Sequence, residues 1–377
     1  EALKARASDI HFEPFEARLR VRYRVDGVLY EQTSPPKHLE RALVSRLKVM
    51  ARLDIAEKRL PQDGMARVRV GEREVDIRVS TVPVAEGERV VLRLLNRESA
   101  LLPLTALGMP EPMRRAFEAL LRLPHGLILV CGPTGSGKTT TLYAAIRQMD
   151  TVGRNVMTIE EPIEYQLPNI GQMEVRPKIG LTFARGLRHI LRQDPDVILV
   201  GETRDAETAE IAIRAALTGH VVFTTLHTND AASAVIRLRD MGVEAYLLAA
   251  ALRAALAQRL VRRLCPACRR PAPVEEGELA AVGAAAAARL RGRTVWSPAG
   301  CPACIGGYRG RLGLFELLVM DEQMQELIRQ GLGTGRELRT LAAGRNVPTL
   351  LDDGLDKVLA GETSLAEVLY VLGNPGL

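Results

Sequence analysis

The sequence predicts an α/β fold organised around a parallel sheet, and two observations carry this prediction. From Met113 onward, apolar stretches of strand length alternate with stretches of helical periodicity. That order is typical of a parallel sheet with helices on both faces. One of the strands, 127–131, ends at a glycine-rich loop that leads into a helical segment, an arrangement typical of phosphate-binding sites.

The 377 residues are enough for two or three domains. The first residues do not resemble a secretion signal and include no initiator Met, so we expect the chain to be a fragment of a longer protein. We predict five parts: a strand-rich mixed domain at 1–98, a linker at 99–112, a domain with the parallel sheet at 113–262, a cysteine module at 263–310 and a mostly helical part at 311–377.

Alternation and turn residues predict the elements of the N-terminal part. Leucine spacing predicts one helix there, and the strands follow the alternation of apolar with polar residues. The predicted strands are 18–25, 28–32, 66–70, 74–82 and 89–96, and the helix is 38–51.

Apolar runs and helical spacing predict the elements of the second part in the same way. The predicted strands are 127–131, 155–159, 197–201 and 220–225, and the predicted helices are 142–149, 182–192, 206–217, 230–241 and 245–260, after a first helix that ends at Leu123.

The composition, with 47% hydrophobic and 25% charged residues, is that of a soluble globular protein. No apolar run approaches the ~18 residues of a transmembrane helix. The net charge of +6 and the pI of about 9.2 are compatible with a nucleic-acid partner, but only 4% of residues are aromatic and available for stacking on bases. A biased genomic composition explains the charge equally well.

The glycine-rich loop matches the phosphate-binding pattern G-x4-G-K-[ST] without a mismatch. Glycines let backbone N–H groups face an anion, the lysine reaches the β- and γ-phosphates, and the following threonine holds Mg²⁺. We therefore predict that ATP with Mg²⁺ binds there, with Thr139 as the protein ligand of the metal. The binding residues are Gly132, Pro133, Thr134, Gly135, Ser136, Gly137, Lys138, Thr139 and Thr140.

Carboxylates follow two of the predicted strands. Glu202 comes directly after the strand 197–201, where a phosphoryl-transfer site needs an acid to hold Mg²⁺ or its water. A capping role at the next helix is the alternative. Glu160, Glu161 and Glu164 follow the strand 155–159, at the edge where parallel sheets place ligands. We predict that Glu160 or Glu164 orients or deprotonates the attacking water.

Two histidines bracket the strand residues 221–225, and several arginines are candidates for phosphate contacts. His220 and His227 are candidates for sensing the γ-phosphate, with a structural role as the alternative. Hydrolysing NTPases often need arginines from outside the loop, although the 51 basic residues do not single any out by composition. The candidates are Arg78 and Arg93 on separate predicted strands and Arg188 and Arg192, one helical turn apart.

Four of the five cysteines form two C-x-x-C pairs. Cys265 with Cys268 and Cys301 with Cys304 are separated by 32 residues that include an alanine-rich insert. Two such turns supply the four thiolates of a tetrahedral Zn²⁺ site, so we predict structural zinc, with a redox pair as the alternative. Cys131 lies in the core strand and is predicted to be inert.

Taken in order along the chain, these motifs resemble the secretion ATPases of type II secretion and type IV pilus assembly (the GspE/PilB group). The resemblance covers nearly the whole chain. It rests on residues 7–14 (ASDIHFEP), 59–64 (RLPQDG), 132–140, the acidic box 160–164, 192–204, and 218–229 with both histidines.

The resemblance implies a PAS-like N-terminal domain joined by a flexible linker to a RecA-like ATPase domain, in a hexameric ring. It implies that Arg78 and Arg93 contact phosphates, that Arg188 and Arg192 form a second pair, and that Glu160 acts on the water. Glu202 then corresponds to the Walker B glutamate, and the two histidines to the His box. The box reads Glu160-Glu161-Pro162, where Glu-Asp-Pro is common, and Thr203 replaces the usual Ile.

The same resemblance implies a cytoplasmic hexamer at the inner face of the cytoplasmic membrane, driving an inner-membrane platform protein. The cysteine module favours the secretion and assembly branches over the retraction branch. The missing N-terminal region is expected to dock onto an accessory membrane-linked component. We expect no direct nucleic-acid partner. The alternatives are a DNA-translocating RecA-like motor and a nucleotide-binding scaffold without hydrolysis.

Overall fold

The computed structural model describes residues 1–32, 34–71, 73–95, 102–331 and 335–373. The chain divides into two compact units, Glu1–Ala100 and Leu101–Leu377. In the described ranges, no helix combines the length and apolar character needed to cross a bilayer.

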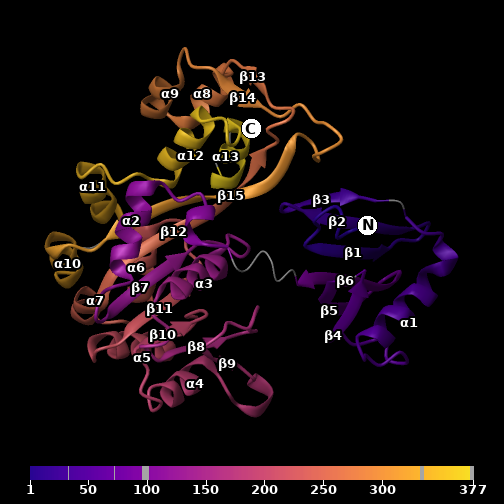
Figure 1. Cartoon of the computed structure of the whole chain (residues 1–377), viewed down its shortest axis with the longest axis horizontal. Coiled ribbons are helices and arrows are strands. Elements are labelled where there is room, and N and C mark those ends of the chain that lie inside the picture. The colour runs from indigo at the N-terminus through magenta and orange to yellow at the C-terminus, as the bar shows by residue number, and fades with distance from the viewer. Residues whose placement is uncertain (33, 72, 96–101, 332–334, 374–377) are drawn as a thin grey trace. The chain divides into compact units, whose positions relative to one another are not determined.

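The first unit is a six-stranded antiparallel sheet with one long helix (Figure 1). The strand order is β3-β2-β1-β6-β5-β4. Most predicted strands are found, and β1 is an additional strand that alternation did not indicate. The elements are β1 (Asp9–Pro14), β2 (Leu19–Val25), β3 (Val28–Glu31), α1 (Glu40–Met50), β4 (Gln62–Val70), β5 (Arg73–Val84) and β6 (Gly87–Leu95).

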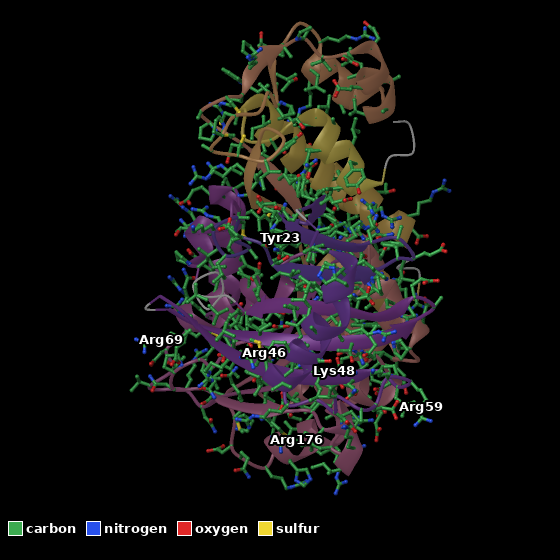
Figure 2. All side chains as sticks on the ribbon, turned by 90° about the vertical axis from the view of Figure 1, so that its right-hand side faces the viewer. Tyr23, Arg46, Lys48, Arg59, Arg69 and Arg176 are labelled. Carbon is green, nitrogen blue, oxygen red and sulfur yellow. The ribbon has the colours of Figure 1, made fainter. Side chains whose placement is uncertain are left out.

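Helix α1 carries a buried cation into this unit. The Lys48 side chain is 1% exposed, forms an ion pair with Glu88 and donates a hydrogen bond to the Glu57 carbonyl oxygen at 2.7 Å. By contrast, Arg59 and Arg69 extend outward into solvent (Figure 2). Because removing one partner of a buried ion pair leaves an uncompensated charge, Lys48 holds the segment after α1 against the sheet.

The second unit is built on a seven-stranded sheet of order β15-β12-β7-β11-β10-β8-β9. All neighbouring strands are parallel except β12 and β15. Helices α2 and α3 pack on one face, and α4, α5, α6 and α7 pack on the other (Figure 1). The elements as far as β12 are α2 (Glu111–Leu120), β7 (Gly126–Cys131), α3 (Lys138–Gln148), β8 (Val156–Glu160), β9 (Gly171–Glu174), α4 (Phe183–Ile190), β10 (Val197–Val200), α5 (Ala206–Leu217), β11 (Val221–Leu226), α6 (Ala231–Asp240), α7 (Ala245–Ala251) and β12 (Leu252–Leu264).

The predicted helix 245–260 is wrong beyond its first two turns. Helix α7 ends at Ala251, and the chain continues as β12. The segment is rich in Ala, Leu, Arg and Gln, which are strong helix formers. A strand buried on both faces shows no alternation to oppose that preference, and β12 is such a strand, paired with β7 and β15.

The region after β12 begins with the cysteine module and then returns to the sheet. The expectation of a mostly helical part from 311 onward is wrong at its start, because Tyr308–Val319 is a strand that pairs with β12. The elements are β13 (Arg270–Ala272), α8 (Glu276–Val282), α9 (Ala284–Leu290), β14 (Val295–Ser297), β15 (Tyr308–Val319), α10 (Glu322–Arg329), α11 (Gly335–Gly344), α12 (Leu350–Leu359) and α13 (Leu365–Leu372).

Candidate functional site

The glycine-rich loop connects the fully buried strand β7 to the N-terminus of α3. Gly137 precedes the helix with a φ of 88°, in the left-handed region that glycine adopts without strain. The first turn of α3 therefore presents unpaired N–H groups and the positive end of the helix dipole at the loop. This geometry suits an anion.

Lys138 is the first residue of α3, and its ammonium lies across the loop. It donates hydrogen bonds to the carbonyl oxygens of Gly132 at 2.7 Å and Pro133 at 3.0 Å. Burial lowers the pKa of Lys138, and the carboxylate of Glu202 acts in the opposite direction. Glu202 therefore favours the charged form of Lys138.

The loop residues fit a nucleoside triphosphate. The Ser136 hydroxyl is buried and has no hydrogen-bond partner among the described residues, and a buried hydroxyl left in this way is costly. A phosphate oxygen cradled by the loop would supply the partner. Residues 132–140 would hold the phosphates, and Thr139, exposed at the start of α3, would hold Mg²⁺. Bound Mg²⁺ would neutralise the charge that develops on the phosphates.

Strand register brings the other candidates to the same edge of the sheet as the loop. Cys131 at the end of β7 lies opposite Leu226 at the end of β11, and Val200 of β10 lies opposite Thr224. Val200 also lies opposite Ile159 of β8. Because these strands are parallel, the loop, Glu202, the acidic box and His227 all follow the carboxyl ends of strands at one edge.

Glu160 is the most enclosed carboxylate at this edge, with a relative exposure of 3%. It accepts hydrogen bonds from the Tyr143 hydroxyl, from Thr158 Oγ1 at 2.5 Å and from Gln172 Nε2 at 3.1 Å. Tyr143 belongs to α3, so this bond connects the acidic box to the phosphate-loop helix. Three donors fix the Glu160 carboxylate in one orientation.

Tyr143 and Gln172 were not among the residues predicted from the sequence. Tyr143 is completely buried, and its contact with Glu160 raises its pKa, although desolvation by burial is the larger cause. A lone tyrosine on a helix gives no indication in sequence of which carboxylate it will meet. Glu164, the alternative to Glu160, is half-buried.

Glu202 lies between a histidine and an arginine. Its carboxylate is 3.4 Å from His227 Nε2 and forms an ion pair with Arg204. Arg204 also reaches Glu161 of the acidic box, at 3.2 Å. Arg204 therefore links the two groups of carboxylates, which the sequence alone did not indicate.

The structure separates the two histidines. His220 precedes β11, and its carbonyl oxygen accepts from the N–H of Gly126 at the start of β7. Its Nδ1 lies 2.9 Å from the carbonyl oxygen of Ala215. A six-residue strand spans about 20 Å. Within one chain, His227 therefore lies at the end of β11 that is next to the loop, and His220 lies at its other end.

We expect His227→Gln to lower kcat for ATP hydrolysis by about 10- to 100-fold, as loss of a partner that orients a metal-site carboxylate does. In a monomeric preparation His220→Gln is expected to change kcat less than twofold, because His220 is remote from the loop. Steady-state phosphate release by the two variants, in parallel, makes the comparison. Equal losses in the monomer would contradict the assignment of His227 to Glu202.

The two candidate arginines of the second unit, Arg188 and Arg192, have different partners. Arg188 on α4 donates to Glu207 at 2.6 Å, at the start of α5. Arg192, beyond the end of α4, lies 2.9 Å from His189 Nδ1. Both are exposed in one chain, and in the part of the chain that the structure describes their side-chain partners are Glu207 and His189 and not residues of the phosphate loop.

Arg78 and Arg93 form a pair in the first unit. They lie directly opposite each other on β5 and β6, so their side chains share one face of the sheet. Arg93 donates to Asp9 at 3.0 Å, whereas Arg78 has no ion pair with any residue that the structure describes. Like charges directly opposite each other on neighbouring strands are unfavourable, so this face of the sheet would suit an anion.

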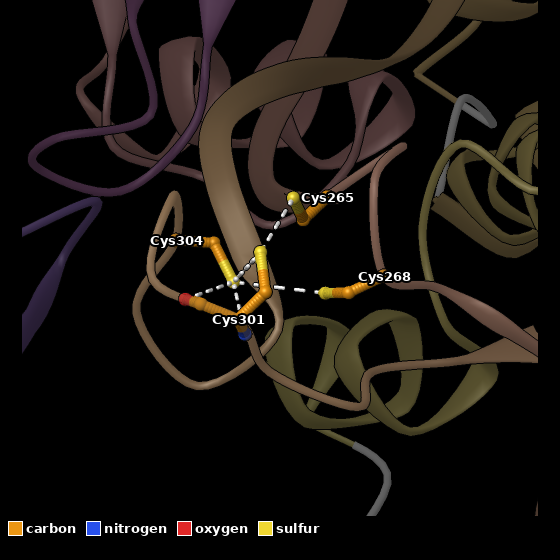
Figure 3. A group of neighbouring side chains, drawn as sticks. All are labelled: Cys265, Cys268, Cys301 and Cys304. Carbon is orange, nitrogen blue, oxygen red and sulfur yellow. Dashed lines mark hydrogen bonds between the residues drawn. The ribbon is translucent and has the colours of Figure 1, made fainter.

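The four module cysteines converge from two turns (Figure 3). Their Sγ atoms all lie within 4.8 Å of one another. Contacts of 3.9, 3.7 and 3.6 Å join Cys265 to Cys301, Cys268 to Cys304, and Cys301 to Cys304. Zn–S bonds of about 2.3 Å place the sulfurs of a tetrahedral site about 3.8 Å apart, whereas a disulfide needs about 2.05 Å. The donor set and spacing fit Zn²⁺.

Cys131 is the fifth cysteine and lies apart from this cluster. Its side chain is completely buried at the end of β7, and burial raises the pKa of its thiol to about 12. A thiol in that state is unreactive.

Comparison with known proteins identifies relatives along the chain. The profile of the type II/IV secretion system proteins matches residues 1–370. Type II secretion system protein E of Dickeya dadantii is 55% identical over 375 residues, which is 98% of this chain and 73% of that protein. Type II secretion system ATPase E of Vibrio cholerae is 52% identical over 372 residues, or 98% of this chain and 73% of that protein.

Two solved structures have a similar fold. The pilus retraction motor PilT with bound ADP is 27% identical, with a TM-score of 0.64, over 98% of this chain and 94% of that one. The ATPase DotB of Legionella pneumophila is 22% identical, with a TM-score of 0.69, over 98% of this chain and 92% of that one; at this identity it supports the fold alone. By its profile match and its relatives, the chain belongs to the family of type II/IV secretion system proteins.

Proposed function

We propose that this secretion ATPase hydrolyses ATP at the loop 132–140 and uses the cycle to drive type II protein secretion. The observation that carries the proposal is the convergence at one sheet edge of the loop, Glu202, the acidic box and His227. Relatives named as components of type II secretion, at 50% to 55% identity, favour secretion over pilus assembly.

Each candidate residue has a proposed task in this reaction. Lys138 and the loop N–H groups hold the phosphates, and Thr139 and Glu202 hold Mg²⁺ directly or through water. Glu160, fixed by Tyr143, Thr158 and Gln172, orients the attacking water. Glu164 is the alternative for that task.

Charge on the transferring phosphate needs cations beyond the loop. We propose that Arg78 and Arg93 supply them when the first unit closes over the nucleotide, with 99–112 as the linker. Residues 99–101 of that linker, and residues 96–98 at the end of the preceding domain, lie outside the described residues. Arg188, Arg192 and His220, which one chain does not bring to the loop, are proposed to act across contacts between subunits of a homo-hexamer.

The partners and location follow from the same proposal. The hexamer acts at the cytoplasmic face of the inner membrane on a platform protein, and the part of the relatives that this chain does not span docks onto an accessory membrane-linked component. The cysteine module, 263–310, carries structural zinc. The net charge of +6 is not assigned to nucleic acid.

A genetic experiment tests the proposal. Deletion of the gene is expected to abolish export of secreted proteins while pili and twitching persist, and the wild-type gene is expected to restore export where a Lys138→Ala copy does not. Loss of pili with intact secretion would move the assignment to pilus assembly. ATPase stimulation by single-stranded DNA would favour the DNA-translocating alternative, and a confirmed hexamer no more active than Lys138→Ala would favour a scaffold.

A further inference from the structure

Strand β12 runs alongside β7 and continues past the point where the phosphate loop begins. Ala257 of β12 lies opposite Cys131, the last residue of β7. The next residue along β12 is Gln258, which is 2% exposed. A buried polar side chain therefore lies beside the loop.

The Gln258 side chain is hydrogen-bonded to the phosphate-loop helix. Thr141 Oγ1 donates to Gln258 Oε1 at 2.7 Å, and both side chains are buried. Thr141 lies in the first turn of α3, three residues after Lys138 and two after Thr139. The bond thus ties the turn that presents the proposed phosphate and Mg²⁺ groups to β12, the strand next to the edge strand β15.

The two ends of the loop also pack against Gln258. A Cβ atom at Gly137 would lie 2.8 Å from Gln258 Nε2, and one at Gly132 would lie 2.4 Å from the Gln258 carbonyl oxygen. Only glycine fits at these separations. The first and the last glycine of the pattern are thus in contact with one residue.

We propose that Gln258 is a positioning residue for the phosphate loop. It sets the height and rotation of the first turn of α3 through Thr141, and the course of the loop through Gly132 and Gly137, without touching nucleotide. The proposal rests on the proposed function in one respect, that the loop binds nucleotide. A hydrogen bond serves this purpose better than apolar packing because its direction and length are narrowly defined.

Single and double variants of the buried Thr141–Gln258 pair distinguish a positioning role from a role in packing alone. Removing one partner leaves a buried polar atom unsatisfied and lowers stability, whereas replacing both by apolar groups of similar shape is nearly neutral. Stability is therefore expected to recover in a double variant. The alignment of the loop is not expected to recover, because the directional bond is still absent.

The experiment uses the full chain and compares Thr141→Val, Gln258→Met and the double variant with wild type. The measurements are the thermal midpoint without nucleotide, the Kd for Mg-ADP, and KM and kcat for ATP. We expect both single variants to melt lower and the double variant to return toward the wild-type midpoint. In all three, Kd and KM are expected to rise about tenfold, the equivalent of one ordinary hydrogen bond.

Two controls make the result specific. Thr141→Ser keeps the hydroxyl and is expected to keep the wild-type Kd. Thr363→Val removes another buried hydroxyl that bonds to β12, from Thr363 Oγ1 to the Arg262 carbonyl oxygen at 2.8 Å, away from the loop. It is expected to lower the midpoint without changing Kd.

Recovery of both stability and Kd in the double variant would show that the pair only packs, and would overturn the proposal. So would a Thr141→Ser variant whose Kd is about tenfold above the wild-type value, a comparison that is informative even if the other substitutions do not fold. A wild-type chain that binds Mg-ADP but hydrolyses no ATP would contradict the proposed function alone, since the Kd comparison still tests Gln258.

Discussion

Lys138→Ala is expected to reduce ATP hydrolysis by about a thousandfold or more, the scale on which cations that stabilise a transferring phosphoryl group act. The Lys138 ammonium is held on the loop by two backbone carbonyl oxygens. It is also partly buried, which strengthens its interaction with a phosphate. Alanine removes this charge without disturbing β7 or the helix propensity of α3. Phosphate release under saturating ATP measures the loss.

The matched control for this prediction is Lys178→Ala. Lys178 is an exposed lysine of the same unit, and its removal is expected to leave kcat within twofold of wild type. Both variants are expected to melt within a few degrees of the wild-type protein, since neither side chain belongs to the buried core. Hydrolysis by Lys138→Ala within tenfold of wild type would place the chemistry elsewhere.

Loss of a cysteine from the module is expected to have the second large effect. Structural Zn²⁺ contributes about 10–16 kcal/mol of apparent binding free energy in small zinc domains, far more than any single contact here. Cys301→Ser is therefore expected to lower bound zinc from about one ion per chain to nearly none. Residues 263–310 are expected to become sensitive to protease, because two short strands and two short helices cannot retain their fold alone.

Cys131→Ala provides the control for the metal measurement. Its thiol is buried at the end of β7, apart from the cluster, so this variant is expected to retain its zinc. Elemental analysis of both proteins and limited proteolysis with and without a chelator make the comparison. A disulfide between module cysteines in freshly purified protein, with no zinc, would instead support the redox alternative.

The phosphate loop and the four cysteines could be predicted from the sequence because each is defined by spacing within a short stretch. A glycine pattern between a buried strand and a helix leaves few alternatives, and the structure has that strand, loop and helix. The zinc prediction similarly required only that the two C-x-x-C turns lie side by side in the fold, and their sulfur atoms do lie close together. Local chemistry was sufficient in both cases.

Strands β12 and β15 could not be predicted, because they contradict local preference. Residues 252–264 consist mainly of helix formers, and pairing with β7 and β15 overrides that tendency. The alternation that identifies a half-buried strand disappears when both faces are buried. The error mattered for function, since Gln258 lies on β12.

Hydrogen-bond partners that are far apart in the chain also could not be predicted from the sequence. Thr141 and Gln258 are 117 positions apart, and Tyr143 and Glu160 meet only through the packing of α3 on the sheet. The histidines show the converse. Only seven positions separate them in the sequence, yet they lie at opposite ends of the extended strand β11. Proximity in sequence was a poor guide to proximity in the fold.

Strand β12 has one more consequence. It begins beside β7, passes the phosphate loop at Gln258 and ends at Leu264, directly before Cys265. Antiparallel pairing with β15 clamps it along most of its length. The cysteine cluster therefore follows directly on the strand that contacts the nucleotide loop, so a displacement of β12 at the cluster would reach the loop through the backbone of β12 and the Thr141–Gln258 hydrogen bond.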